Sequence, residues 1–150
     1  MNITQNGIEL IKKFEGFSAV PYKDTAGYLT IGFGHKVVNG EVFGSLGSME
    51  ATALLMKDIQ WAVTTINKAV EVQLTQNQFD ALVCFVYNVG AHNFCTSTML
   101  KKINEQLFGE AANEFLKWCN ETVNGKKVKN KGLYSRRQNE REYFLTGKTL

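Results

Sequence analysis

Two carboxyl residues and a threonine, close together near the N-terminus, could carry hydrolytic chemistry. They are Glu15, Asp24 and Thr30, in the segment KKFEGFSAVPYKDTAGYLTIGFGH. Glu15 ends a helix-like pattern, where the partial negative charge of a helix C-terminus favours the neutral acid, a possible proton donor. Asp24 lies on or just before a predicted sheet, where solvent keeps it ionised, and Thr30 can hold a water. Two carboxyl groups in unlike environments suit glycosidic bond cleavage, although a surface glutamate and a turn aspartate would give the same pattern.

The elements around these residues predict how they are positioned. Residues 4–14 have apolar side chains at three- and four-residue intervals, Thr4 can cap this helix, and Gly16 can take the left-handed conformation that ends it. From about Pro21 to Gly47, glycines and alternating β-prone residues predict an antiparallel sheet of two or three strands. The dipeptide Asn39-Gly40, between two β-prone runs, predicts a hairpin.

The rest of the chain is predicted to be helical. Apolar periodicity favours one long helix at Ser48–Val70 and a second at Thr75–Val89, ended by Gly90. Apolar side chains surround most of the second helix, which is typical of the buried centre of a core. Shorter helices are predicted near 97–107, 109–121 and 135–146.

Together these elements predict an α+β fold that is mostly α. A small antiparallel sheet lobe and a larger helical lobe would be joined by the long helix, with the active-site cleft between them. The length fits a single domain, 1–150. The small lobe would cover about 15–60, and the helical lobe about 70–150 plus the N-terminal helix.

The composition, 44% hydrophobic and 21% charged, is typical of an ordinary globular protein. No apolar run approaches the roughly 20 residues that span a bilayer, and the first residues lack the pattern of a secretory signal, so no stable membrane anchor is expected. Cys84, Cys95 and Cys119 are widely spaced, without a Cys/His cluster. We therefore expect reduced thiols, with Cys84 packed as a small apolar side chain, and neither a metal nor another cofactor.

The net charge of +3 is unevenly distributed. Between Lys126 and Arg141 there are seven basic residues and one acid, Glu140. Such a face would attract an anionic polymer or surface. Nucleic acid is the alternative partner, but the segment has neither a recognisable nucleic-acid module nor interleaved aromatic residues, so no nucleic acid is expected.

The segment EGF…PYKDTAGYLTIGFGH, with eight residues between Glu15 and Asp24 and five between Asp24 and Thr30, resembles the catalytic segment of a known family. These are the phage-type lysozymes, the T4-lysozyme-like muramidases of tailed phages. The resemblance continues in TQNQFDALVCFVYNVG, which is similar to that family's buried central helix, and in SRRQNEREYFLTG near the C-terminus. It covers nearly the whole chain in the expected order.

The resemblance implies hydrolysis of the β-1,4 bond between N-acetylmuramic acid and N-acetylglucosamine in bacterial peptidoglycan. Glu15 would protonate the glycosidic oxygen, and Asp24 with Thr30 would position and activate a water on the other face of the sugar. The family is generally held to invert the anomeric carbon, which agrees with carboxyl groups roughly 6.5–9.5 Å apart. Arg136 corresponds to an arginine that pairs with the catalytic glutamate and would orient Glu15. Arg137 is the alternative for this role, and an exposed basic helix start would explain both arginines without one.

Three further residues match positions that line the family's cleft. Gly34 falls where the cleft floor approaches the sugar, and a glycine lets backbone come close. Tyr87 could stack on a sugar ring, and Asn88 could bond an acetamido group. Ordinary packing at a helix end is the alternative for these last two residues.

His35 is expected to be structural rather than catalytic. The resemblance implies an ion pair between this histidine and an acid on the long helix, and Asp58 matches that place. Lys36 departs from the pattern, because some relatives have an apolar cleft residue here. The departure could change substrate preference without affecting catalysis.

The resemblance also implies an endolysin of a phage or prophage. We expect a monomer that waits in the host cytoplasm until a phage-encoded membrane pore, a holin, lets it reach the periplasm and cell wall. Two alternatives stay open. One is a lytic transglycosylase, which forms anhydro ends and for which a water-positioning pair is superfluous. The other is a non-hydrolytic wall-binding module on a lysozyme scaffold.

Overall fold

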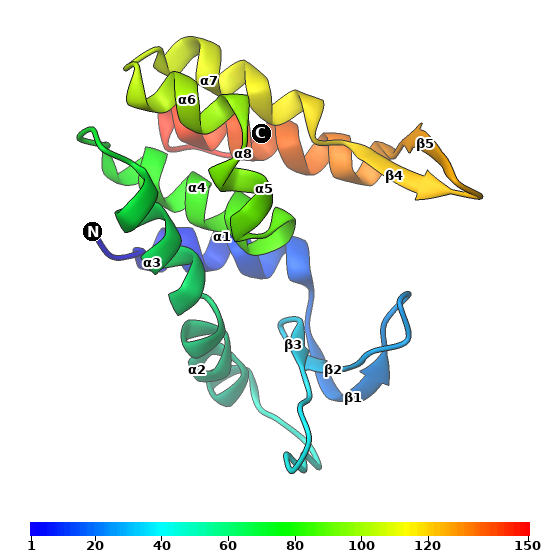
Figure 1. The fold of residues 1–150 in the computed structure, drawn as a ribbon. Coiled ribbons are helices and arrows are strands. Elements are labelled where there is room, and N and C mark those ends of the chain that lie inside the picture. The colour runs from blue at the N-terminus through cyan, green and yellow to red at the C-terminus, as the bar shows by residue number, and fades with distance from the viewer.

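The computed structural model of the protein describes all residues 1–150, and most of them are helical (Figure 1). Along the chain the elements are α1 (Gln5–Glu15), β1 (Ser18–Lys23), β2 (Leu29–Gly32), β3 (His35–Lys36), α2 (Ser48–Asp58), α3 (Gln60–Ala69), α4 (Gln76–Val89), α5 (Ala91–Cys95), α6 (Thr98–Asn104), α7 (Phe108–Glu114), the 3₁₀ turn η1 (Phe115–Lys117), β4 (Asn120–Val123), β5 (Lys126–Lys129) and α8 (Lys131–Thr146). This confirms the predicted α+β, mostly α class. No helix combines the length and the apolar character that crossing a membrane would require.

The small lobe contains a three-stranded antiparallel sheet in the order β1-β2-β3. The prediction of a hairpin at Asn39-Gly40 is wrong: these residues form a turn, but no strand follows it. Val38 and Val42 beside the turn are 59% and 93% exposed. Because their side chains have no apolar surface to pack against, their β propensity produces no strand. The carboxylate of Glu41 instead accepts the backbone N–H of Val38.

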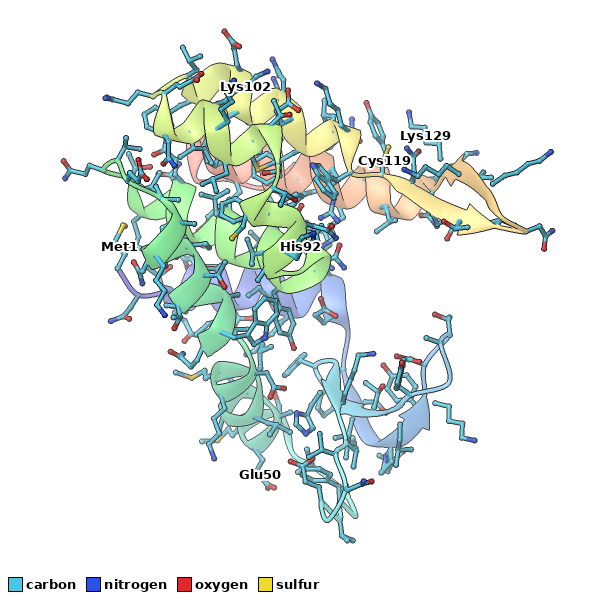
Figure 2. The ribbon with its side chains drawn as sticks, viewed as in Figure 1. Met1, Glu50, His92, Lys102, Cys119 and Lys129 are labelled. Carbon is cyan, nitrogen blue, oxygen red and sulfur yellow. The ribbon has the colours of Figure 1, made fainter.

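A hairpin that the sequence analysis did not predict lies almost entirely between the two helices predicted at 109–121 and 135–146. The helix predicted at 109–121 ends as η1 at Lys117, and β4 and β5 then pair across Asn124-Gly125. Both turn residues have positive φ, 50° and 77°, as a two-residue hairpin turn requires. The hairpin projects from the helical lobe, with Lys129 on its second strand (Figures 1 and 2).

The predicted long helix is two helices, α2 and α3, with a break at Ile59. Ile59 has ψ near zero (−8°) and a fully buried side chain. The helix α2 packs against β2 and β3, whereas α3 packs against α4 and α5. The break therefore lets one segment cover the sheet and the next join the helical lobe, as Figure 1 shows.

The helix α4 is the centre of the core, as predicted. Its residues from Phe79 to Val86 are all buried, and it contacts α1, α3, α5 and α8. Asp80 on this helix accepts hydrogen bonds from the backbone N–H and the hydroxyl of Thr4, the N-cap residue of α1. At the other end, Gly16 ends α1 with φ of 68°. The start of α1 is thus tied to the core, and the position of Glu15, its last residue, follows from that.

Candidate active site

A cleft of about 760 Å³ is lined by the sheet on one side and by α2, α3 and the end of α4 on the other. Six of the seven site residues expected from the sequence line it: Glu15, Asp24, Thr30, Gly34, Tyr87 and Asn88. The seventh, Arg136, contacts Glu15 from α8. Residues that are far apart in the chain therefore meet in one site.

Glu15 is held from two sides. Nη1 of Arg136 donates to its Oε1 at 3.1 Å. On the other side, Gly34 has φ of +80°, and a Cβ added there would lie 3.0 Å from Oε2 of Glu15. A side chain at position 34 would thus be strained by the backbone and would press on the carboxylate. Glycine at this position keeps the Glu15 carboxyl group in place and open to the cleft.

A buried ionic network lies behind Glu15. Glu140 is completely buried on α8. Its Oε1 accepts from Nε of Arg136 at 2.9 Å, and its Oε2 accepts from Nη1 of Arg137 at 2.6 Å. Arg137 also donates to Oδ1 of Asn88. The carboxylate of Glu140 therefore joins two guanidinium groups. That of Arg136 also binds Glu15, and that of Arg137 also binds Asn88, so the network reaches the cleft wall at two points.

The thiol of Cys84 completes this network. Burial, and then the charge of Glu140, raises the pKa of the Cys84 thiol well above its ordinary value. It therefore stays protonated and donates to Oε1 of Glu140 at 3.4 Å. The expectation that Cys84 is buried is confirmed, although its neighbours are ionic as well as apolar.

The prediction of a single basic face near the C-terminus is wrong. Arg136 and Arg137 are buried, because their guanidinium groups are occupied by carboxylates of the protein itself. They are not an exposed helix start. Arg141 is half-buried and donates to Asn113. Only the lysines of β5 and the first residue of α8 remain exposed: Lys126, Lys127, Lys129 and Lys131.

Asp24 is held by its own turn and by one lysine. Its Oδ1 accepts the backbone N–H groups of Ala26 and Tyr28, at 2.9 Å and 2.8 Å. Its Oδ2 accepts from Nζ of Lys36 at 2.9 Å. The hydrogen bond from Lys36 and then that from Tyr28 lower the pKa of Asp24 below its usual value. Asp24 is therefore ionised, as the sequence predicted, and protein donors contribute to this as well as solvent.

Thr30 lies on β2, paired with Tyr22 on β1 and with Lys36 on β3. It is 3% exposed, and its hydroxyl donates to the carbonyl of Tyr28 at 3.0 Å. Because the proton is used in this bond, the hydroxyl oxygen presents lone pairs to the cleft. Thr30 can therefore accept a hydrogen bond from a water there.

Aromatic side chains form another part of the cleft wall. The rings of Tyr87 on α4 and Trp61 on α3 have centroids 6.1 Å apart. Burial, and then the charges of Asp58 and Glu15, raises the pKa of Tyr87, so its hydroxyl is neutral. Trp61 is 43% exposed, and such a ring offers an apolar face to a sugar. The sequence interpretation missed Trp61, which reads there as one more residue of a long helix.

His35 is paired with two acids. Its Nδ1 lies 2.7 Å from Oδ2 of Asp58, the partner implied by the resemblance, and its Nε2 lies 2.8 Å from Oε2 of Glu41, which the sequence did not identify. Burial alone would lower the pKa of His35, but the hydrogen bonds and charges of Glu41 and Asp58 outweigh burial and raise it. A protonated His35 satisfies both carboxylates, which indicates a structural role at the edge of the cleft.

Comparisons with known proteins identify the family and the fold of this chain. The family model described as phage lysozyme matches residues 12–140. An endolysin of Bacillus phage B103 is 46% identical over 99% of this chain, which spans 56% of that protein, little more than half its length. An endolysin of Acyrthosiphon pisum secondary endosymbiont phage 1 is 40% identical, and the match covers 96% of this chain and 98% of that protein. The solved structure of the endolysin from Escherichia coli O157:H7 phage FAHEc1 has a TM-score of 0.94 and 35% identity, covering 100% of this chain and 97% of that one.

Proposed function

The chain belongs to the phage lysozyme family, as its sequence resemblance predicted, and we propose that it is a muramidase acting on bacterial peptidoglycan. The bond cleaved is the β-1,4 link from N-acetylmuramic acid to N-acetylglucosamine. The observation that carries this proposal is the position of Glu15, Asp24 and Thr30 on the walls of one open cleft.

Glu15 is the general acid of the proposed reaction. It is 21% exposed, so it can reach the glycosidic oxygen of a bound glycan. Arg136 orients the carboxyl group through its contact with Oε1 and leaves Oε2 facing Gly34 and the cleft. In the proposed step the carboxylic acid gives its proton to the glycosidic oxygen as the bond to the leaving sugar breaks.

Asp24 is the general base, with Thr30 as the second group on the water. Its ionised carboxylate takes one proton from the water, and the oxygen of Thr30 accepts a hydrogen bond from the water's other O–H, which stays on the product as the new anomeric hydroxyl. The water attacks the anomeric carbon on the face opposite Glu15, which inverts its configuration. Asp24 must be unprotonated for this step, and the lowered pKa of Asp24 favours that state.

The remaining cleft residues bind the glycan. Gly34 lets backbone approach the sugar, and Tyr87 with Trp61 offers ring faces for stacking. The amide of Asn88 is fixed by Arg137, so its remaining NH₂ group is available to a sugar acetamido group. No step of this mechanism requires a metal or another cofactor.

The proposed setting is phage or prophage lysis. The monomeric protein waits in the host cytoplasm until a holin pore lets it reach the periplasm and the wall, and it binds neither nucleic acid nor membrane stably. The exposed lysines of β5, Lys126, Lys127 and Lys129, favour docking on the anionic wall.

Digestion of purified peptidoglycan in ¹⁸O-labelled water tests the reaction type. Hydrolysis places labelled oxygen on a reducing N-acetylmuramic end, and mass spectrometry detects the added mass. Unlabelled anhydro ends, lighter by one water, would make the protein a lytic transglycosylase. Wall binding without any released ends would make it a binding module.

A further inference from the structure

Lys36 is a charged cleft residue that has no role in the proposed mechanism, although it contacts the proposed base. Its Nζ lies 2.9 Å from Oδ2 of Asp24, and the same ammonium lies 4.4 Å from the ring centroid of Tyr28. The side chain of Lys36 is 59% exposed, yet it is held between a carboxylate and an aromatic face. Its placement is therefore specific rather than that of a free surface lysine.

The position of Lys36 on strand β3 places its side chain beside Asp24 and Thr30. The strand has two residues, and successive side chains of a strand point to opposite faces. His35 points inward and is 8% exposed, so Lys36 points to the other face. There it stands directly opposite Thr30 on β2. Side chains opposite each other in an antiparallel pair lie roughly 4.5–5.5 Å apart at Cβ, so the ammonium is brought next to the two groups that would hold the water.

Lys36 also determines which part of the Asp24 carboxylate is free. A carboxylate has about four lone-pair directions. The N–H groups of Ala26 and Tyr28 occupy two on Oδ1, and Lys36 occupies one on Oδ2. One direction on Oδ2 remains, and that is where a water can be bound and deprotonated.

We propose that Lys36 is a positioning residue for this reaction, which fixes the Asp24 carboxylate in one orientation and in its anionic form. The inference rests on the proposed function, because it assigns Asp24 the role of the base.

The other charged and titratable groups of the cleft do not share this contact. They come from α1, the sheet, α2 and α4: Glu15, Tyr22, His35, Lys57, Asp58 and Tyr87. His35 is occupied by Glu41 and Asp58, and Lys57 forms no ion pair with Asp24. Lys36 is thus the one cation on Asp24, and its hydrogen bond is the largest cause that lowers the pKa of this carboxyl group.

A pH profile of kcat/KM tests the role of Lys36. A general base must be unprotonated, so activity falls as the pH drops through its pKa. This fall is the acid limb of the profile. In Lys36→Met the acid limb is expected to move to higher pH, because the pKa of Asp24 rises. In Lys36→Arg, which keeps a cation, the acid limb is expected to stay near that of the wild type. Lys57→Met is the matched control, because it removes the same charge from the same cleft without touching Asp24.

Raising the salt concentration sharpens this test. The Lys36 ammonium is mostly exposed, so added salt should screen it and shift the wild-type limb toward that of Lys36→Met. An acid limb that Lys36→Met leaves unchanged, or that Lys57→Met moves equally, would overturn the proposal.

A ¹³C NMR titration of the Asp24 side-chain carboxyl separates this inference from the muramidase assignment, because it requires no turnover. The pKa of Asp24 is expected to be higher in Lys36→Met than in the wild type and in Lys57→Met. An unchanged titration would overturn the role of Lys36 even in an active muramidase. A raised pKa of Asp24 in Lys36→Met, together with an acid limb of kcat/KM at the same pH as in the wild type, would also overturn the role of Lys36. Full activity of Asp24→Asn would instead overturn the proposed function.

Discussion

The two carboxyl groups of the cleft are held in opposite ways. Glu15 is held by Arg136, which lies 121 residues later and is anchored by the fully buried Glu140. Asp24 is held by backbone groups within four residues and by Lys36, only 12 residues later and mostly exposed. One proposed catalytic group is therefore tied to a buried ionic network, and the other belongs to a local turn near the surface.

Because of this difference, mutations in the two regions should have different effects on stability. Removing one partner of a buried ion pair leaves an uncompensated charge and is strongly destabilising, whereas exposed pairs contribute little. Changes near Glu15 should therefore lower stability and activity together. Changes near Asp24 should lower activity alone.

The largest effect is expected for Asp24→Asn. Without a base, the rate of wall digestion should fall roughly 10²–10⁴-fold. The amide oxygen can still accept the turn N–H groups of Ala26 and Tyr28, so the urea unfolding midpoint should stay close to that of the wild type. A large drop in that midpoint would contradict the contrast between the two regions.

Glu140→Gln should disrupt the buried ionic network that holds Glu15. It leaves Arg136 and Arg137 with reduced compensation in the core, and we expect a loss of about 3–5 kcal/mol in the free energy of unfolding, measured by urea titration. Activity should fall as well, because Arg136 loses its anchor. Glu142→Gln on the same helix is the control, since the Glu142 carboxylate contacts only Thr146. Equal stability of both variants would refute the network's importance.

Gly34→Ala should have a smaller effect on stability, about 1–3 kcal/mol, from the strain of positive φ. It should also reduce kcat, because the new methyl group presses on Glu15. Gly40→Ala is the matched control: Gly40 has φ of +90° and open space around its Cβ. If both variants lose the same fraction of kcat, the contact with Glu15 is not the cause.

The pH dependence due to His35 should be the smallest effect, because burial opposes its two hydrogen bonds. The pKa of His35 is raised above its ordinary value of 6.5 in the folded state. Its contribution to stability is therefore fully present below the unfolded pKa and is lost as the pH rises through the folded one. Unfolding free energies measured from about pH 5 to about pH 9 should fall in the upper part of this range, and less so in His35→Asn. If the unfolding free energy has the same pH dependence in the wild type and in His35→Asn, the ion pairs of His35 with Asp58 and Glu41 do not contribute to stability.

The sequence predicted those parts of the site that depend on local structure. The helix that ends at Glu15 and the buried helix α4 follow from periodicity. Asp24 was expected on or just before the sheet, whereas it lies in the turn that follows β1, the first strand. The pairing of His35 with Asp58 was available only through resemblance. Lys36 was identified as a departure from the family, but its contact with Asp24 depends on strand register.

The errors occurred where tertiary packing decides the outcome. Asn39-Gly40 and Asn124-Gly125 carry the same hairpin signal, yet only the second joins two strands. The break at Ile59 likewise depends on which neighbours the two helices meet. Glu140 was visible only as one acid in a basic segment, and no local pattern reveals that two arginines bury it. Composition alone made that segment look like an exposed basic face.

The proposed roles of the two carboxyl groups are tested most directly by product analysis of three proteins. Wild type, Glu15→Gln and Asp24→Asn would each be incubated with purified peptidoglycan, and the released ends identified by mass spectrometry. Reducing N-acetylmuramic ends from the wild type, with release by both variants reduced roughly 10²-fold or more, is the predicted result. Equal release by all three proteins would show that Glu15 and Asp24 do not carry the reaction.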